Sequence, residues 1–263
     1  EVNHDDPFAS MAQIRIGVDP DNALGRQLSD LEKSQLPYAA SQAANKVAYE
    51  IRERWKVQAG RVFDRPTPLT TNAALYRKAT KDKPYAEIYI RDEAFKGTPP
   101  AKYLLTEVEG GQRRRKGFER LLQGRGLLSP SQFAVMGRGA RPNQYGNVPA
   151  GQVTKILSQL GAQRDKHQNQ TETSAKRRRT RAPTGGEYFV IIKRRGRLRP
   201  GVYERISTGW GSAVRSIFIF TNTAAYQQRY DIFGMAEDTW KRLMPFYLKR
   251  ELDKAMETAR PLP

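Results

Sequence analysis

The sequence predicts an α+β fold in which an antiparallel sheet packs with an amphipathic helix near the N-terminus and a long kinked helix near the C-terminus, with long loops and an extended basic arm. Apolar residues recur at spacings of three and four from 36 to 55 and again from 240 to 255, which is typical of amphipathic helices. Short alternating or β-branched runs at 84–91, 187–193 and 214–220 predict strands. At 263 residues the chain is long enough to bury a full core.

Residues 1–33 are predicted to form a polar leader and N-terminal extension, in which apolar side chains alternate from Ile14 to Val18 as in a short strand. Ser34 is a suitable N-cap, and a helix is predicted from there to about Gln58. Its apolar stripe is rich in alanine, so a second helix or a sheet can approach it closely. We expect the stripe to face the core; the alternative is a groove that binds a partner helix.

Residues 34–160 are predicted to form the helix-strand-helix part of a single α+β domain. Pro66 and Pro68 make 61–75 a connector, because proline ends helices and interrupts strand ladders. In the run 84–91, alanine and isoleucine alternate with tyrosine and charged residues, as in a half-buried strand. We expect the tyrosine face to pack under a helix or a neighbouring subunit; stacking on nucleic-acid bases is the alternative.

The centre of the chain holds two glycines followed by four cations. Gly110 and Gly111 permit positive φ, and Arg113 to Lys116 come soon after them. We predict a turn that feeds a basic helix ending near 124–126. Four cations at a helix N-terminus oppose the helix dipole, so this arrangement favours an anionic partner. The alternative is a solvated charged face.

A loop, a helix and a basic arm follow. Residues 127–151 are punctuated by glycine and proline and predict a long loop, and 151–160 predict a helix. Residues 161–186 contain seven Lys or Arg and too few apolar side chains to offset the entropy of ordering, so we predict a disordered or extended arm. Within it, Lys176 to Arg181 are typical of a nucleic-acid-binding arm or a localisation signal, and can equally reach across to a neighbouring subunit.

Residues 187–263 are predicted to complete the same domain with antiparallel strands and the C-terminal helix. The run 187–193 is rich in β-branched and aromatic residues, as in a well-buried strand. Residues 202–206 return as its hairpin partner, and a third strand follows. From Ala224 a helical pattern takes over, and Pro245 is expected to kink or split that helix.

The charge of the chain is large and unevenly placed. The net charge of +19 must meet an anionic partner or be neutralised by acidic neighbours. Residues 110–142 hold eight basic residues and one acidic residue, whereas 234–258 hold five of each. Nucleic acid or an acidic protein surface is therefore the expected class of partner. The residues expected to contact DNA or a partner are Arg113, Arg114, Arg115, Lys116, Arg120, Lys176, Arg177, Arg178, Arg179, Arg181, Arg194, Arg195 and Arg197.

The sequence offers little for catalysis, so we expect no enzymatic activity, no cofactor and no metal. There is no cysteine, which excludes disulfides, thiolate nucleophiles and cysteine-based zinc sites. The two histidines, His4 and His167, fall in the leader and the basic arm, and no phosphate-binding loop, dinucleotide glycine pattern or nucleophile elbow is present. Asp92 and Glu93 are candidate Mg²⁺ ligands only under the alternative of a metal-dependent nuclease. No apolar run approaches the roughly 20 residues that span a bilayer, so no membrane partner is expected.

Short motifs occur in a fixed order along most of the chain from Leu36 to the C-terminal helix. They are Leu36-Pro37-Tyr38-Ala39, Tyr103-Leu104, Gly110-Gly111-x-Arg113-x-x-Lys116-x-x-Glu119, Tyr145-Gly146-Asn147, Ile156-Leu157-Ser158, Pro200-Gly201-Val202-Tyr203-x-Arg205 and Tyr226-x-x-Arg229-Tyr230-Asp231. In this order the motifs resemble tailed-bacteriophage virion proteins, in particular the group related to minor tail protein Z and the tail-completion proteins of the neck. The run Lys176 to Arg181 matches no pattern in that family.

The resemblance implies a non-enzymatic structural subunit made in the host bacterial cytoplasm and built into the virion. Such a subunit forms a homo-oligomeric ring at the head-tail junction or the top of the tail, around the channel through which DNA leaves. The implied partners are other virion proteins (portal or adaptor, tail tube or terminator) and packaged DNA. The alternative function is a free-standing nucleic-acid-binding protein that acts through its Arg and Lys clusters.

Overall fold

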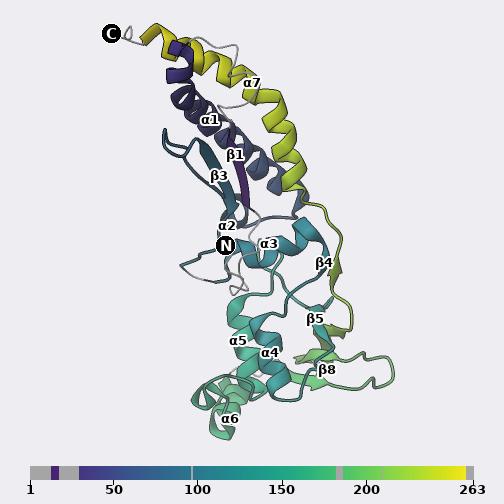
Figure 1. The fold of residues 1–263 in the computed structure, drawn as a ribbon. Helices are drawn as coiled ribbons and strands as arrows, with labels where there is room; N and C mark the ends of the chain where they lie inside the picture. The colour runs from purple at the N-terminus through teal and green to yellow at the C-terminus, as the bar shows by residue number, and fades with distance from the viewer. Residues whose placement is uncertain (1–12, 18–29, 96, 182–185, 209, 259–263) are drawn as a thin grey trace. The chain divides into compact units, whose positions relative to one another are not determined.

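The structure is a computed structural model that describes residues 13–17, 30–95, 97–181, 186–208 and 210–258 of the chain (Figure 1). The fold is α+β, with helices packed on antiparallel sheets. The chain forms two compact units. Unit 1 comprises residues 1–111 and 227–263, and unit 2 comprises residues 112–226. This division differs from the expected single domain, because the chain leaves unit 1 after the double glycine and returns to it just before the C-terminal helix.

Unit 1 contains a three-stranded antiparallel sheet in the order β1-β3-β2. Its strands are β1 (Gln13–Gly17), β2 (Ala74–Arg77) and β3 (Tyr85–Ile90). The alternation predicted for β3 is confirmed, since its alanine and two isoleucines are buried and the residues between them are half-buried. The buried face of the sheet packs against helix α1 (Asp30–Val62).

The alanine-rich stripe of α1 is core, as predicted, and the partner-groove alternative is wrong. Ala43, Ala44 and Ala48 are completely buried, which lets α1 lie close both to the sheet and to α7 (Ile232–Thr258) (Figure 1). The two helices are antiparallel: Lys46 binds the carboxylate of Glu251 near one end, and Arg54 donates to Thr239 near the other.

Several element boundaries in unit 1 differ from the sequence prediction. Helix α1 begins at Asp30 rather than at Ser34. The predicted connector 61–75 contains one helical turn, α2 (Pro68–Thr71), which starts at a proline because the N–H of a first-turn residue needs no partner. Helix α3 (Pro100–Glu109) then ends at Gly110, where φ is +77°.

The C-terminal helix starts eight residues later than Ala224, at Ile232. Residues Ala225–Tyr226 instead form the short strand β9, which pairs with β4 (Gly111–Gln112). Helix α7 is not split at Pro245 and continues through it to Thr258. None of the helices in the described part of the chain is both long and apolar enough to cross a membrane.

Unit 2 contains a four-stranded antiparallel sheet in the order β5-β8-β7-β6. Helices α4 (Gly117–Gly124) and α5 (Ala150–Gln159) contribute with it to one hydrophobic core, which includes Leu122, Ile156, Leu157, Val202 and Phe218. The strands are β5 (Phe133–Met136), β6 (Glu187–Ile191), β7 (Gly201–Thr208) and β8 (Gly211–Thr221).

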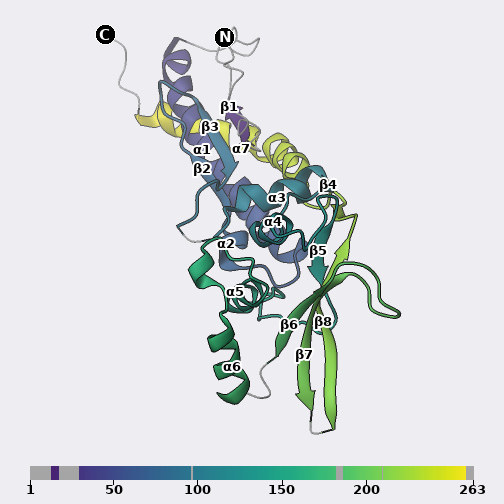
Figure 2. The same ribbon diagram turned by 90° about the horizontal axis from the view of Figure 1, so that it is seen from below.

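Two strands of this sheet correct the sequence prediction. Strand β5 lies inside the segment predicted as the loop 127–151; it has only four residues and gains its partners from β8. Strand β6 is less buried than predicted, because it occupies an edge of the sheet and only Ile191 is fully covered. Beyond β5 and β6, strands β7 and β8 continue as a two-stranded ribbon (Figure 2).

The described part of 161–186 is folded rather than extended. It contains a short 3-10 turn, η2 (Lys166–Gln168), and helix α6 (Glu172–Arg181). Thr171 caps α6, because its hydroxyl accepts from the N–H of Ser174 at 3.2 Å while its own N–H donates to the Ser174 hydroxyl at 2.9 Å. Alanine, lysine and arginine have high helix propensity, so a solvated helix forms here without a buried face.

Candidate functional site

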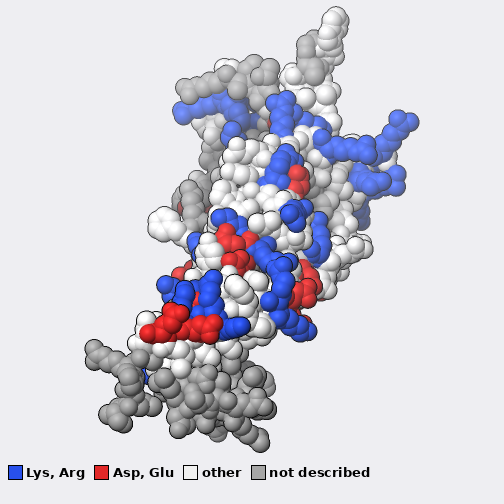
Figure 3. Space-filling view, turned by 90° about the horizontal axis from the view of Figure 1, so that it is seen from above, with Lys and Arg blue, Asp and Glu red and all other residues white. Residues whose placement is uncertain are grey.

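Unit 2 carries nearly all of the net charge. It holds 23 of the 46 Lys and Arg residues but only 5 of the 27 Asp and Glu residues, an excess of 18 positive charges, whereas unit 1 has an excess of one. On the face shown in Figure 3, acidic side chains lie among basic ones over one part of the surface, and another part shows Lys and Arg with almost no acidic side chains. The cations of unit 2 are therefore the candidate functional site.

The few carboxylates of unit 2 are all engaged within the unit. Glu119 binds Arg113, Glu204 binds Arg215 at 2.6 Å, and Asp165 accepts from the backbone N–H of His167. Glu187 lies among three arginines, and Glu172 occupies the first turn of α6, where a negative charge complements the helix dipole. Most cations of unit 2 consequently have no carboxylate of their own unit to neutralise them.

The run Arg113 to Lys116 is not the start of a basic helix. It is an extended segment between β4 and α4, which begins at Gly117. Arg113 binds the buried Glu119, and Arg115 donates to the carbonyl oxygens of Pro130 and Gln132. The guanidinium groups of Arg113 and Arg115 hold the loop before β5, and their expected contact with DNA or a partner stays a prediction.

The three remaining cations of this region point to solvent. The side chains of Arg114, Lys116 and Arg120 are exposed. Lys116 also takes part in starting α4, because its backbone N–H donates to Glu119 at 2.7 Å, as in half of a capping box. Arg114 and Arg120 are available to meet an anion, whereas burial of its ammonium group and the nearby charge of Arg113 lower the pKa of Lys116.

The cations of α6 divide in the same way. Lys176 and Arg177 are exposed, whereas Arg178 donates to the carbonyl oxygen of Gly186 at 2.7 Å and Arg179 binds Glu187 at 2.8 Å. The bond from Arg179 and the nearby charge of the other arginines hold the pKa of Glu187 below its usual range. The side chain of Arg181 lies outside the described residues.

The loop between β6 and β7 presents the densest group of exposed cations. Arg194, Arg195 and Arg197 are all exposed, and so are Lys193 and Arg199, which belong to the same turn but were not among the predicted contact residues. We name these five residues the β6–β7 cation loop. The backbone N–H groups of Arg195 and Leu198 each donate to the other residue's carbonyl oxygen, at 3.0 and 2.9 Å, and Gly196 has a φ of +55°. The loop is thus a hydrogen-bonded turn rather than an irregular segment.

Many of the motif residues that suggested a virion protein serve to hold the fold. Arg229 binds both carboxylate oxygens of Glu107, at 2.6 and 3.1 Å, and the hydroxyl of the buried Tyr230 donates to the carbonyl oxygen of Trp55 at 2.9 Å. The hydroxyl of Tyr203 donates to the carbonyl oxygen of Arg199, which braces the end of the cation loop. These contacts account for the arginine and the two tyrosines of the motifs as structural residues, and they assign no catalytic or binding role to them.

The described residues show no arrangement suited to catalysis. His167 is exposed and has no carboxylate or nucleophile bonded to its ring, and His4 lies outside the described residues. Asp92 and Glu93 are exposed after β3, and no group of three His, Asp or Glu residues in the described ranges is placed to hold a metal ion.

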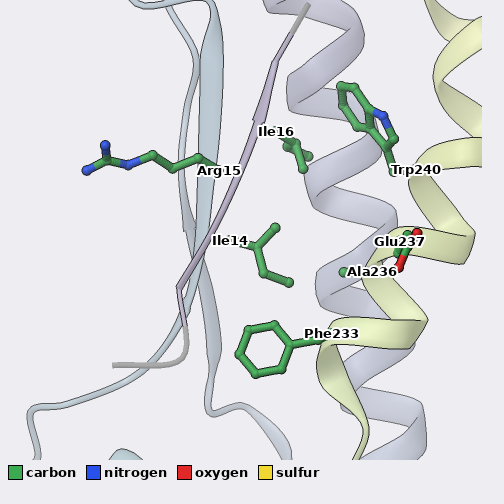
Figure 4. A pocket seen from close by; sticks show the side chains of 7 residues that line it. All are labelled: Ile14, Arg15, Ile16, Phe233, Ala236, Glu237 and Trp240. Atoms are coloured by element: carbon green, nitrogen blue, oxygen red, sulfur yellow. The ribbon is translucent and has the colours of Figure 1, made fainter. Parts of the chain in front are cut away.

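A shallow hollow of about 320 Å³ in unit 1 likewise lacks reactive groups (Figure 4). Ile14 and Ile16 line it from β1, and Phe233, Ala236 and Trp240 line it from α7. The two charged residues that line the hollow both form ion pairs with other side chains. Arg15 binds Glu87 at 3.0 Å, and Glu237 binds Lys241 at 2.5 Å, the helical pair expected from their spacing of four.

The chain was compared with known proteins at the level of family, sequence and fold. It matches no protein-family model, no curated protein and no solved structure. The virion-protein resemblance therefore remains a prediction. What the structure contributes on its own is the concentration of unneutralised cations in unit 2.

Proposed function

We propose that this chain is a structural component of a tailed-phage virion, a ring-forming tail-completion, neck or minor tail protein at the head-tail junction, in which unit 2 faces DNA. The observation that carries the DNA contact is the division of charge: unit 1 is almost neutral, and unit 2 has an excess of 18 cations. A unit with this excess repels itself unless it meets a polyanion. Duplex DNA presents one negative charge per about 1.7 Å and is such a polyanion.

The β6–β7 cation loop is the part of unit 2 best suited to phosphate contact. Its five side chains are exposed, and its backbone is fixed by the paired hydrogen bonds between Arg195 and Leu198. Arginine binds phosphate through two parallel N–H groups, so a preformed turn that carries several arginines loses little freedom on binding. Arg114, Lys116 and Arg120 add further exposed cations in the same unit.

Unit 1 has the features of an assembly surface. Its charges nearly cancel, and it exposes large apolar side chains, among them Tyr38, Phe95 and Phe246. Aromatic residues are enriched at subunit interfaces, where they supply most of the buried apolar area. These exposed aromatics support a role in packing against neighbouring copies or other virion proteins.

The second candidate is a free-standing nucleic-acid-binding protein, which the same charge division favours. The two functions differ in what the purified chain does. A free-standing binder binds duplex DNA tightly as a monomer or dimer, with affinity that falls steeply as salt rises. A neck subunit binds weakly alone, gains affinity when it assembles, and sediments with finished particles.

A pair of matched variants tests the DNA contact. The triple variant R194A/R195A/R197A removes three exposed cations from the β6–β7 cation loop, and K78A/K81A/K83A removes three exposed cations from the β2–β3 loop of unit 1. We expect the first variant to weaken duplex binding at least tenfold and to reduce the slope of log affinity against log salt by two to three, about 0.9 per phosphate contact. The second should bind like the wild type. Equal losses in both variants would show that only net charge matters and that unit 2 is not the DNA-facing part.

The virion assignment needs a separate test. The producing phage particles should be purified through a density gradient and their proteins identified by mass spectrometry, with the position of the chain located by labelling and electron microscopy. The proposal requires a fixed number of copies near the head-tail junction. Absence of the chain from infectious particles, together with tight DNA binding in solution, would leave the free-standing binder as the function.

A further inference from the structure

The ribbon formed by β7 and β8 ends in a solvent-exposed tryptophan. Thr208 and Gly211 are the last paired residues of the hairpin, so Trp210 lies in the tight turn between the strands. Its side chain is fully exposed. The two other tryptophans of the chain differ: Trp55 is completely buried, and Trp240 is half-buried in unit 1.

The outer part of this hairpin has no structural need for an indole. Within the described residues, 206–208 and 211–213 pair with one another, since the pairing of β6 with β7 reaches Arg205 and that of β5 with β8 covers 218–221. The ribbon projects beyond the rest of the sheet (Figure 2). The indole of Trp210 is exposed to solvent, so its ring face is available to stack on a partner.

Three arginines lie at the base of the free ribbon. Arg205 on β7 is 4.0 Å from the carboxylate of Glu187, and Arg178 and Arg179 of α6 approach the same carboxylate at 4.0 and 2.8 Å. One carboxylate balances only one of three guanidinium groups. The side chains of Arg179 and Arg205 are more than half exposed, so this cluster presents an excess of positive charge to solvent.

We propose that the β7–β8 hairpin is a nucleic-acid-binding arm in which the indole of Trp210 stacks on an unpaired base of single-stranded DNA while the arginine cluster around Glu187 binds the phosphates beside it. This inference rests on the proposed DNA contact of unit 2 and names its chemistry. Base stacking on exposed aromatic side chains, next to a basic surface that follows the backbone, is a general mode of single-strand binding.

The spacing of the two parts fits a short stretch of strand. Arg205 and Thr208 are three positions apart on β7, which is roughly 10 Å at 3.4 Å per residue. Stacked nucleotides are spaced by about 3.4 Å, so the strand from Arg205 to the start of the turn that holds Trp210 spans roughly three nucleotides. The β6–β7 cation loop lies at the opposite end of strand β7 and acts independently of the arm.

The test uses the full-length chain with a dT oligonucleotide and with an abasic oligonucleotide of equal length, which keeps the phosphates and lacks the bases. We expect W210A to weaken dT binding about tenfold, in the range found for loss of one stacked base, and to leave abasic binding unchanged. The matched control F95A removes an equally exposed aromatic residue from unit 1 and should change neither. Circular dichroism should show that W210A is folded. We expect no loss of structure, because Trp210 is exposed and its replacement leaves no cavity.

Fluorescence supplies a second readout that identifies the residue. The dT oligonucleotide should quench the emission of the wild type and of W240F but should not quench W210F, in which only Trp55 and Trp240 emit. Quenching that persists in W210F, or equal weakening of dT and abasic binding in W210A, would overturn the stacking proposal. A blue shift of the Trp210 emission on raising protein concentration without DNA would instead show that a second copy covers the indole, and would also overturn it.

The outcomes separate this inference from the proposed function. If R194A/R195A/R197A weakens duplex binding while W210A binds the dT oligonucleotide like the wild type, the DNA contact of unit 2 stands and the arm is not a stacking element. If the wild type binds neither duplex nor single-stranded DNA at low salt, both proposals fail.

Discussion

Arg113 forms a bidentate ion pair with Glu119, with N–O distances of 2.5 and 2.9 Å, and the carboxylate is completely buried. The backbone N–H groups of Ala134 and Lys116 donate to the same carboxylate, each at 2.7 Å. Arg113 also donates to the carbonyl oxygen of Ala134 at 3.2 Å. One ion pair thus joins the segment before α4, the start of α4 and strand β5, and it explains why an arginine in the most basic run of the chain is withdrawn from the surface.

Replacing Arg113 should destabilise unit 2. R113A leaves the buried carboxylate of Glu119 without its counter-ion, and removal of one partner of a buried pair costs about 3 kcal/mol. The control R114A changes the exposed neighbour and should alter the free energy of unfolding by less than about 0.5 kcal/mol. Urea unfolding at neutral pH measures both. Equal, small effects would mean that the pair is solvated in solution.

The same pair predicts a dependence of stability on pH. Burial by itself raises the pKa of Glu119, but the bonds from Arg113 and from the two backbone N–H groups outweigh burial and hold that pKa below its usual value. The resulting stabilisation is complete above the unfolded pKa of about 4.3 and is lost as pH falls through the lower folded pKa. We expect the melting temperature of the wild type to fall below about pH 4 more steeply than that of R113A. Parallel curves for the two proteins would contradict this assignment.

Gly201 should not tolerate a side chain. A Cβ at this position would lie 2.3 Å from the carbonyl oxygen of Phe218 on the paired strand, and a backbone atom in the middle of a sheet cannot move away. G201A should therefore destabilise unit 2 by about 2 kcal/mol, as overpacking does. The control G124A adds a Cβ that meets nothing within 4 Å at the end of α4 and should be neutral or slightly stabilising. Thermal unfolding distinguishes the two; similar melting temperatures would show that β7 can shift to make room.

The Tyr230 hydroxyl should contribute measurably to unit 1. It is buried, which raises the pKa of the phenol, and it donates to the carbonyl oxygen of Trp55 at 2.9 Å. Y230F removes this bond and should cost about 1 kcal/mol. Y38F removes a hydroxyl from a tyrosine that is half-exposed on α1 and should cost nearly nothing. If chemical denaturation gives both variants wild-type stability, the bond from Tyr230 is not formed in solution.

Local sequence patterns predicted most of the elements. The alternation at 85–90 placed β3, and the alanine stripe placed the buried face of α1, because each pattern repeats with the period of its structure. The misses have physical causes. Strand β5 is too short for its alternation to stand out, and it exists because β8 supplies its hydrogen bonds. Helix α6 has too few apolar residues to predict burial and forms instead from propensity and the cap at Thr171.

The candidate site was predictable as a set of cations but not as individual contacts. Arg113 and Arg194 look alike in the sequence, and both were expected to meet DNA or a partner. Arg113 instead holds the buried Glu119, six residues further along, whereas Arg194 stays exposed in a tight turn and donates only to the carbonyl oxygen of Gly196 among the described contacts. The sequence did not predict the exposure of Trp210. Whether a tryptophan is exposed depends on where the neighbouring strands end, and here the turn between β7 and β8 leaves it in solvent.

By itself, the sequence determined the α+β class, the main periodic helices and strands, the turn at Gly110 and Gly111, and the size of the positive charge, since each of these is set by residue type and local spacing. Only the tertiary structure decided that the charge belongs almost entirely to one of two units, and which cations remain available there. The reason is that a cation is engaged by whichever carboxylate or carbonyl oxygen lies within about 3 Å of it in space. That neighbour is chosen by the packing of the whole chain.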